Sequence, residues 1–383
     1  MAAPNKTRRG LAGTWLAAIP GVVALVVTFS VHRPEAQSPP QTPTPAGLEF
    51  NDSHFHLTNY IQQGISVRQF LQIMGTRVRR STLFGIPLQQ QWSYANSGEF
   101  APTYYLQSDA PLYYYSFTDA FIASAYRSLS PTEQARFDPM ITGFNPADMY
   151  AVDHIRRVLA TFPGVFSGIG EFSVHKEFVS AKIAGETASL TNPALDRVLD
   201  FAGEAGLVVI LHNDIDMPFA KTDSEPAYLT QMKALLRRHA NTTIIWAHVG
   251  LGRIVHPVQV SAQAAERPPT QVEIVDDILN DPAYAHVNFD ISWDEVAKYA
   301  IATPDSIARV AAVLSRHPDR FLFGTDTVAP AGPALYFTVF DMWAPVWRLL
   351  TPEASRKVRT GNYERIFDEG RRRVRAWEKT NLP

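Results

Sequence analysis

From residue 48 onward, short runs of β-branched and aromatic residues alternate with longer amphipathic stretches. The short runs are typical of buried strands, and the longer stretches show the period of helices that bury one face. Their regular alternation predicts a parallel sheet whose strands are joined by crossover helices. The predicted strands are Leu48–His56, Ser81–Ile86, Pro139–Phe144, Val165–Phe172, Leu207–Leu211, Thr243–Ala247, Val287–Ile291 and Phe321–Gly324.

The stretches between the strands predict helices over Ala147–Thr161, Asn192–Ala205 and Glu225–His239. The second of these carries its own boundary signals, with Thr191 or Asn192 as N-cap, Pro193 in the first turn and Gly206 as the stop. Eight strand-helix units over about 335 residues predict an α/β fold of the distorted (β/α)8 TIM barrel type. An open doubly wound sheet is the alternative, but the sequence has no glycine-rich phosphate loop that favours it.

The second and third units are the least regular part of this pattern, because residues 88–137 are longer than a loop and a helix require. Residues 92–117 are rich in Tyr, Trp and Phe and follow the second predicted strand. We expect them to overhang the rim of the barrel and to supply the apolar wall of a substrate pocket. Alternatively, Tyr113, Tyr114 and Tyr115 pack this insert onto the barrel or form the surface of a homo-oligomer.

The first 47 residues lack the alternating strand and helix pattern of the rest of the chain. Lys6, Arg8 and Arg9 precede an uncharged apolar run over residues 11–31, and a run of this length can span a bilayer. Residues 1–33 therefore predict a signal peptide or a membrane anchor, and the five prolines of residues 34–47 predict an extended linker. We expect an exported protein, periplasmic or secreted, or one that this segment anchors to the membrane, with residues 48–383 as the barrel domain.

Composition narrows the classes of protein that remain. The hydrophobic fraction of 46% suffices for a large core, which excludes a disordered chain. The absence of cysteine excludes disulfide-stapled modules, zinc fingers, iron-sulfur proteins and thiol-nucleophile enzymes. A metal in this protein must therefore be held by nitrogen and oxygen.

The net charge of -2 combines a basic N-terminal segment with a mildly acidic remainder. Residues 1–47 carry +3, so residues 48–383 carry -5. Because the barrel domain has no basic excess to neutralise phosphates, we expect no binding of nucleic acid. A small-molecule substrate is the better expectation, with membrane contact only through the N-terminal segment.

Residues with metal-ligand chemistry follow the ends of the predicted strands: His54 and His56, Glu171, His212, His248 and Asp326. Successive members lie 36 to 41 residues apart or at multiples of such a step, which is the length of one strand-helix unit. All of them are therefore expected on the C-terminal rim, where barrel active sites lie. The His-x-His spacing places two imidazoles on one face of a strand, so both can reach one ion.

Histidine nitrogens with carboxylate oxygens suit a divalent metal, Zn²⁺ first and Mn, Fe, Co or Ni less selectively. A carboxylate such as Glu171 can bridge two ions, which then activate a water between them. Asp326 is the candidate catalytic residue, because a carboxylate at this place can bind the metal and accept the proton of the attacking water. One ion and two ions both fit this pattern.

At these positions the chain resembles the amidohydrolase superfamily of metal-dependent hydrolases, with a TatD-like fourth strand. The resemblance rests on D-S-H-F-H at residues 52–56, I-G-E at 169–171, His212, W-A-H-V-G at 246–250, F-G-T-D at 323–326 and G-N-Y-E-R-I-F at 361–367. It implies a distorted barrel, one or two divalent metals, and hydrolysis of an ester, lactone, amide or phosphoester. In some branches of the superfamily the reaction is instead a decarboxylation with one metal, and Glu171 then binds no ion.

Substrate contacts are expected from side chains that follow the sixth and seventh strands: Arg253, His256, Asp290 and Trp293. His175, Lys176 and Glu177 follow the fourth strand, and such a charged loop is usually only solvated. The remaining histidines of the barrel, His154, His239, His286 and His317, are interpreted as structural. Besides the hydrolase, two alternatives remain: a mononuclear decarboxylase of an aromatic or dienoic acid, and a degenerate barrel that binds a ligand without turnover.

Overall fold

The computed structural model of the chain describes residues 49–100, 110–185, 188–218, 225–252 and 270–382. The predicted leader and linker at residues 1–47 lie outside the described residues, so both stay predictions. Arg253 and His256 lie outside them as well. Within the described ranges, no helix combines the length and the apolar character needed to cross a membrane.

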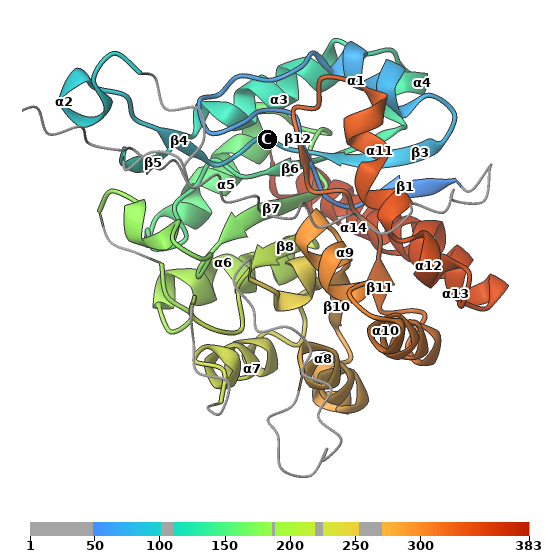
Figure 1. Ribbon diagram of the computed structural model, residues 1–383. Helices are drawn as coiled ribbons and strands as arrows, with labels where there is room; N and C mark the ends of the chain where they lie inside the picture. Colours follow the sequence, from blue (N-terminus) through green and yellow to red (C-terminus); the bar gives the residue numbers. More distant parts are fainter. Residues whose placement is uncertain (1–48, 101–109, 186–187, 219–224, 253–269, 383) are drawn as a thin grey trace, which may run out of the picture. The chain divides into compact units, whose positions relative to one another are not determined.

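Eight parallel strands form one curled sheet whose order follows the chain (Figure 1). They are β1 (Phe50–Asp52), β3 (Val78–Leu83), β6 (Phe137–Ile141), β7 (Gly168–Ser173), β8 (Val208–His212), β9 (Ile244–Trp246), β10 (Val287–Asp290) and β11 (Phe321–Leu322). Each strand pairs in parallel with the one before it in this order. A strand is therefore present in each of the eight predicted regions, and the arrangement is consistent with the predicted α/β barrel.

The two edge strands of the sheet, β1 and β11, meet through hydrogen bonds just beyond their ends. The backbone N–H of Ser53 donates to the carbonyl oxygen of Phe323 at 3.0 Å, and that of Asp326 donates to His54 at 2.8 Å. Two short strands, β2 (Phe55–His56) and β12 (Thr327–Val328), then pair in parallel. The curled sheet thus returns on itself at its C-terminal rim.

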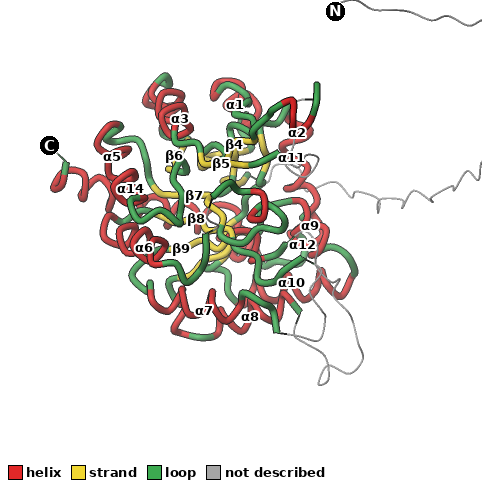
Figure 2. The backbone as a smooth tube through the Cα atoms, turned by 90° about the vertical axis from the view of Figure 1, so that its left-hand side faces the viewer, coloured by secondary structure: helices red, strands yellow, loops and turns green. Residues whose placement is uncertain are grey.

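Helices lie outside the sheet, and Figure 2 shows them around the central strands. They are α1 (Val67–Met74), α2 (Tyr94–Ser97), α3 (Phe117–Arg127), α4 (Pro131–Gln134), α5 (Ala151–Thr161), α6 (Pro193–Ala205), α7 (Leu229–Arg238), α8 (Gln271–Asn280), α9 (Asp294–Ala300), α10 (Pro304–Arg316), α11 (Pro333–Met342), α12 (Ala344–Trp347), α13 (Pro352–Arg356) and α14 (Asn362–Asn381). A π-helical turn, Lys357–Gly361, joins the last two.

Helix α6 forms where its boundary residues predict it. The side chain of Asn192 accepts a hydrogen bond from the N–H of Ala194, Pro193 occupies the first turn, and Gly206 ends the helix with a φ of 78°. A left-handed residue at this point favours glycine, because it has no side chain to clash with the preceding turn. Helices α5 and α7 are also confirmed, although both begin about four residues later than predicted.

The alternation of side chains along β8 connects the core to the rim. Val208 and Ile210 belong to a small apolar cluster that also contains Ile366 and Phe367 of α14. Val209 and Leu211 belong to the larger cluster, which contains the buried faces of the surrounding helices such as α6 and α7. Because side chains alternate between the faces of a strand, the next residue on the face of Val208 and Ile210 is His212. The strand therefore delivers a histidine to the inner face at the point where the apolar core ends.

The first predicted strand is divided in two, which corrects the single run expected over Leu48–His56. The carboxylate of Asp52 accepts the backbone N–H of His54 at 3.0 Å, so that N–H is not available to the sheet. The strand register also shifts between Phe50 and Asp52. This local turn separates β1 from β2 without removing either histidine from the rim.

The irregular second unit contains a hairpin of β4 (Leu88–Gln90) and β5 (Leu112–Tyr114). Its buried side chains Leu88 and Leu112 share an apolar cluster with Val179 and Ile183, which follow β7, and Tyr114 packs against this cluster. The hairpin thus packs onto the segment after β7, as expected from the alternative in which Tyr114 packs this region onto the barrel. Trp92 and Tyr94 of the same insert are exposed.

Candidate metal centre

The six side chains predicted to hold a metal come together at the C-terminal ends of the strands. His54 directly precedes β2, and His56 ends it. The others lie on β7 (Glu171), on β8 (His212), in the turn after β9 (His248) and between β11 and β12 (Asp326). Five of them are almost fully buried, and the Asp326 side chain is 11% exposed. Six residues from five separate regions of the chain therefore face one another inside the protein.

Four of these side chains surround one point, which we call the first subsite: His54 Nε2, His56 Nε2, Glu171 Oε2 and Asp326 Oδ1. The two nitrogens lie 3.4 and 3.2 Å from the Asp326 oxygen, in that order. They lie 3.7 and 3.4 Å from the Glu171 oxygen. The four atoms are thus near one another, yet none of these pairs is at the distance of a strong hydrogen bond.

The other oxygen of Glu171 faces a second group of atoms, the second subsite: Glu171 Oε1, His212 Nδ1 and His248 Nε2. Oε1 lies 2.5 Å from the nitrogen of His212 and 3.5 Å from that of His248. Glu171 therefore stands between the two subsites with one oxygen toward each. This is the position that the sequence predicted for a bridging carboxylate.

Hydrogen bonds fix which nitrogen each histidine of the first subsite presents. His56 Nδ1 lies 3.3 Å from the carbonyl oxygen of Gly85, which can only accept, so Nδ1 carries the proton. His54 Nδ1 lies 3.0 Å from Oδ2 of Asp290 and donates to that carboxylate. In both rings Nε2 is the nitrogen that faces the subsite, which is how a metal-binding imidazole is usually oriented.

Asp290 orients a third ring as well. Its Oδ1 accepts the backbone N–H of His248 at 2.8 Å and the hydroxyl of Ser292. Because that hydroxyl donates its proton to Asp290, its oxygen accepts from His248 Nδ1 at 2.8 Å. A single buried carboxylate thus sets the orientation of His54 directly and of His248 through Ser292.

His212 is held from both sides. Its Nε2 lies 3.0 Å from Oδ1 of Asp214, opposite the short contact of Nδ1 with Glu171. Lys176 adds a cation here, because its Nζ donates to Glu171 Oε1 at 3.3 Å. The charged sequence around Lys176 predicted a solvated loop, but in the structure this residue is only 9% exposed.

Several residues of the centre adopt a left-handed backbone that non-glycine residues rarely use. The φ angles of His248, Val249, Trp293 and Asp326 are 56°, 50°, 78° and 52°. Each such residue costs on the order of 1–3 kcal/mol and is held in place by its surroundings. The turns after β9, β10 and β11 thus give up local stability at or next to the candidate ligands His248 and Asp326 and at Trp293.

Burial and charge act in opposite directions on the titratable groups. Burial lowers the pKa of His54, but the Asp290 carboxylate outweighs it and holds that pKa well above its ordinary value. Burial raises the pKa of Glu171, but the Lys176 ammonium and the imidazoles hold it well below its ordinary value. The pKa of Asp326 is lowered as well, because the nearby histidines outweigh burial. The carboxylates of the centre are therefore negatively charged at neutral pH, in a place with little water.

Asp52 lies behind the first subsite and ties its two halves together. One oxygen accepts the N–H groups of His54 and Thr325, and the other accepts the hydroxyls of Thr325 and Tyr336. Burial raises the pKa of Asp52 to about 6, although these four hydrogen bonds oppose that shift. The residue thus links the segment that carries His54 to the segment that carries Asp326.

The residues present fit a divalent metal. Among the described side chains, neither Nε2 of His54 nor Nε2 of His248 has a hydrogen-bond partner, although both are buried. A tetrahedral ion with N and O ligands holds its ligand atoms about 3.4 Å apart, and the four distances from a histidine nitrogen to a carboxylate oxygen in the first subsite are 3.2 to 3.7 Å. Three triads, His54–His56–Glu171, Glu171–His212–His248 and His54–His248–Asp290, have ligand atoms within 4.8 Å of one another.

The predicted substrate contacts are placed unequally. The ring of Trp293 lies 5.3 Å from that of His248, so this side chain borders the centre. Asp290 is fully buried, and its two oxygens accept hydrogen bonds from His54 and His248. It therefore orients these histidines and is not exposed to a substrate. Arg253 and His256 are outside the described residues. His175, on the loop after β7, stacks on Tyr228 with ring centroids 3.8 Å apart.

The histidines interpreted as structural lie away from the centre. His154 contacts Asp119, His239 contacts Asp196 and Asp200, and His317 contacts Asp276. His286 is half-buried at the start of β10.

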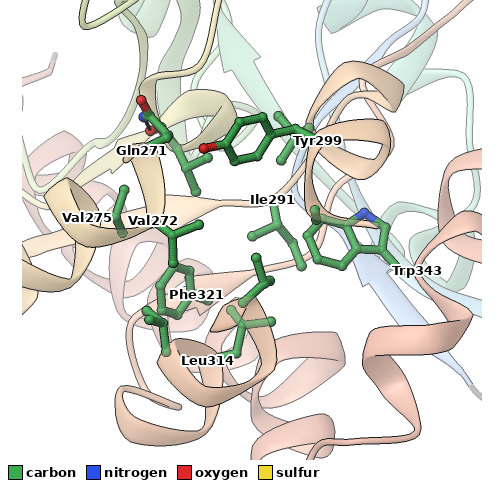
Figure 3. Close-up of a pocket in the computed structure, with 13 residues that line it drawn as sticks. Gln271, Val272, Val275, Ile291, Tyr299, Leu314, Phe321 and Trp343 are labelled. Atoms are coloured by element: carbon green, nitrogen blue, oxygen red, sulfur yellow. Dashed lines mark hydrogen bonds between the residues drawn. The ribbon is translucent and has the colours of Figure 1, made fainter. Parts of the chain in front are cut away.

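An apolar pocket adjoins the residues that follow two of the polar positions. Val249 follows His248 and Ile291 follows Asp290, and both line the pocket. Figure 3 shows Ile291 and Trp343 on one side and Val272 and Val275 on the other. The side chains that line this pocket, next to the turns after β9 and β10, are therefore mostly aliphatic or aromatic. They fit a packing role and offer few polar groups to a substrate.

Three side chains that position ligands were not predicted: Asp52, Asp214 and Ser292. Each lies two residues from a predicted position, before His54, after His212 and after Asp290. Polar residues at a spacing of two along a strand end share one face, so this spacing was a usable signal.

Comparison with known proteins gives one sequence match. The family described as amidohydrolase matches residues 52–368. No curated protein matches the chain.

Solved structures with a similar fold include several described as enzymes. An amidohydrolase from Burkholderia multivorans with bound zinc has a TM-score of 0.50 and 13% identity, covering 84% of this chain and 99% of that chain. A putative 2-pyrone-4,6-dicarboxylic acid hydrolase from Pseudomonas putida has a TM-score of 0.48 and 12% identity, covering 84% and 98%. A 2,6-dihydroxybenzoate decarboxylase from Rhizobium has a TM-score of 0.47 and 14% identity, covering 84% and 99%. At these identities the likeness concerns the fold.

Proposed function

Because the chain belongs to the amidohydrolase family, we propose that it is a metal-dependent hydrolase that cleaves an ester, lactone, amide or phosphoester bond of a small molecule. The observation that carries this proposal is the pair of buried nitrogens, Nε2 of His54 and of His248, that lack a partner among the described residues. A buried imidazole nitrogen without a partner is costly unless an ion or a ligand uses its lone pair.

The residues divide into holders of the ion and groups that position them. His54, His56, Glu171 and Asp326 hold an ion at the first subsite, and His212 and His248 are the additional ligands if a second ion binds. With nitrogen and oxygen donors and no sulfur, Zn²⁺ is the expected metal. When bound, such an ion polarises a carbonyl or phosphoryl oxygen and makes a water molecule more acidic.

Asp326 is the proposed catalytic base. Its pKa is held low by the surrounding histidines, so it is negatively charged and carries no proton at neutral pH. Oδ1 faces the two histidines of the first subsite, and Oδ2 lies 3.9 Å from His248 Nε2. In this role the carboxylate accepts the proton of the attacking water and returns it to the leaving group.

We assign Asp290 to positioning instead of substrate binding, because its oxygens serve His54 and His248. Trp293 remains a proposed substrate contact beside His248, together with Arg253 and His256. The proposal also keeps the predicted export of the chain through residues 1–47 and the predicted homo-oligomer, which a membrane fractionation and a measurement of mass in solution test directly.

The test combines metal content with a substrate screen. Mass spectrometry of the purified full chain is expected to find at least one divalent ion per chain, and a panel of esters, lactones, amides and phosphoesters is expected to give chelator-sensitive hydrolysis. His54→Ala is expected to lose both properties, whereas His154→Gln, a histidine outside the centre, keeps them. Hydrolysis that persists without metal, or release of carbon dioxide from aromatic or dienoic acids in place of hydrolysis, contradicts the proposal.

A further inference from the structure

Lys176 brings a positive charge to one side of the metal centre only. Its ammonium lies 3.3 Å from Glu171 Oε1, the oxygen that faces the second subsite. The other oxygen, Oε2, faces His54 and His56 of the first subsite. The two subsites that share Glu171 therefore differ in charge.

We propose that Lys176 restricts this centre to one tightly bound divalent cation, held at the first subsite, because its ammonium occupies the electrostatic place of a second cation. The inference rests on the proposed metal centre and adds the number of ions and the residue that determines it. Lys176 is then a positioning and selectivity residue and not a ligand.

The number of donor atoms and their spacing also distinguish the subsites. The first has four donors, two nitrogens and two carboxylate oxygens, and each nitrogen lies 3.2 to 3.7 Å from each oxygen. The second has three donors, and two of them, His212 Nδ1 and Glu171 Oε1, are only 2.5 Å apart. Since two ligands of one tetrahedral ion lie about 3.4 Å apart, this pair must separate before an ion can bind between them. The first subsite needs little such rearrangement.

A common framework keeps Lys176 and His212 in place. The carbonyl oxygen of Lys176 accepts the N–H of Val179 at 2.8 Å, which closes a turn. The next residue, Glu177, donates its N–H to Asp214 Oδ2 at 2.8 Å, while Asp214 Oδ1 holds His212 Nε2 at 3.0 Å. The loop that carries the ammonium and the ring that would ligate a second ion are thus anchored to the same carboxylate.

The electrostatic consequence follows from burial. Two positive charges within several ångströms of each other repel far more strongly in a protein interior than in water. Lys176 cannot easily move its charge into solvent, because the residue is only 9% exposed. We therefore expect the ammonium to weaken binding at the second subsite by roughly 100-fold or more.

The test is a titration of the metal-free full chain with Zn²⁺ against a chromophoric chelator, combined with metal content after dialysis. The wild type is expected to retain one ion per chain, and Lys176→Met is expected to retain two, with the second bound at least 100-fold more tightly than in the wild type. Lys298→Met, which removes a lysine from a surface ion pair on α9, is the matched control and is expected to retain one. Lys176→Gln gives a second variant in case the first does not fold, and circular dichroism verifies the fold of each.

The outcomes separate the two proposals. Two tightly bound ions in the wild type overturn this inference and leave the proposed function standing. One ion in the wild type and in both folded Lys176 variants also overturns it, because the ammonium then does not determine the number of ions. No bound ion in any variant overturns the metal centre itself and this inference with it.

Discussion

Nδ1 of His54 lies 3.0 Å from Oδ2 of Asp290, and both side chains are fully buried. The contact joins the segment after β1 to the end of β10 and leaves Nε2 of the histidine facing the first subsite. Hydrogen bonds of this kind fix the tautomer and the orientation of metal-binding rings.

Asp290→Asn is expected to weaken Zn²⁺ binding by about 10- to 100-fold. The amide is uncharged and has only one oxygen, so it cannot replace both carboxylate oxygens that accept hydrogen bonds from His54 on one side and from Ser292 and His248 on the other. Competition with a chelator measures this affinity. Asp294→Asn, an exposed acid on α9, is the matched control and is expected to change nothing. Equal affinity of the wild type and Asp290→Asn contradicts the orienting role.

Removal of metal is expected to lower the melting temperature, because the ion binds the folded chain and screens the buried carboxylates Glu171, Asp290 and Asp326. At a free-ion concentration 100 times the dissociation constant, one site stabilises the fold by about 2.7 kcal/mol. Calorimetry with and without chelator measures the difference, which His54→Ala is expected to abolish. An identical melting temperature for the wild type in both conditions argues against a metal in the folded protein.

Gly170→Ala is expected to destabilise the fold by about 2–4 kcal/mol. The φ of Gly170 is 111°, and a Cβ added there would lie 2.1 Å from the carbonyl oxygen of Ile210 on the neighbouring strand. Because Glu171 follows directly, the same substitution is expected to reduce metal content. Gly332→Ala is the control, since a Cβ there meets nothing within 4 Å. Urea unfolding gives both free energies, and equal values for the two variants contradict the argument.

The stability of the wild type is expected to fall relative to His286→Gln as the pH drops below 6.5. Burial, with help from Arg320, lowers the pKa of His286 from its ordinary value of 6.5. The unfolded chain then binds the proton at a higher pH than the folded chain, so acid favours unfolding from about 6.5 downward until the folded-state pKa is passed. Unfolding free energies of both proteins between pH 5 and 7.5 measure this. A difference that stays constant with pH contradicts it.

The sequence predicted the strands and the ligand positions because both depend on local, repeating signals. His212 ends a buried strand and His248 follows one, and the nearly constant length of a strand-helix unit brings them to the same rim. The spacing did not depend on exact boundaries, so the division of the first strand at Ser53 left the prediction intact.

The contacts that orient the ligands were beyond the sequence because they depend on through-space partners. The position of Asp290 at the end of β10 places it on the rim, and this position was predictable from the sequence. Only the fold shows that its two oxygens accept hydrogen bonds from His54 and His248. Lys176 was misinterpreted for a related reason. A charged loop is usually solvated, and here the loop folds inward because Asp214 and Ser180 hold its backbone.

The closure of the sheet also sets the order of events during synthesis. Ser53 and Phe323, which join the first strand to the last, are 270 residues apart along the chain. A ribosome must therefore translate most of the message before Asp326 can meet the two histidines that emerged near the beginning. An incomplete chain carries His54, His56 and Glu171 without Asp326, so the four donors of the first subsite come together only in molecules whose translation has passed Asp326.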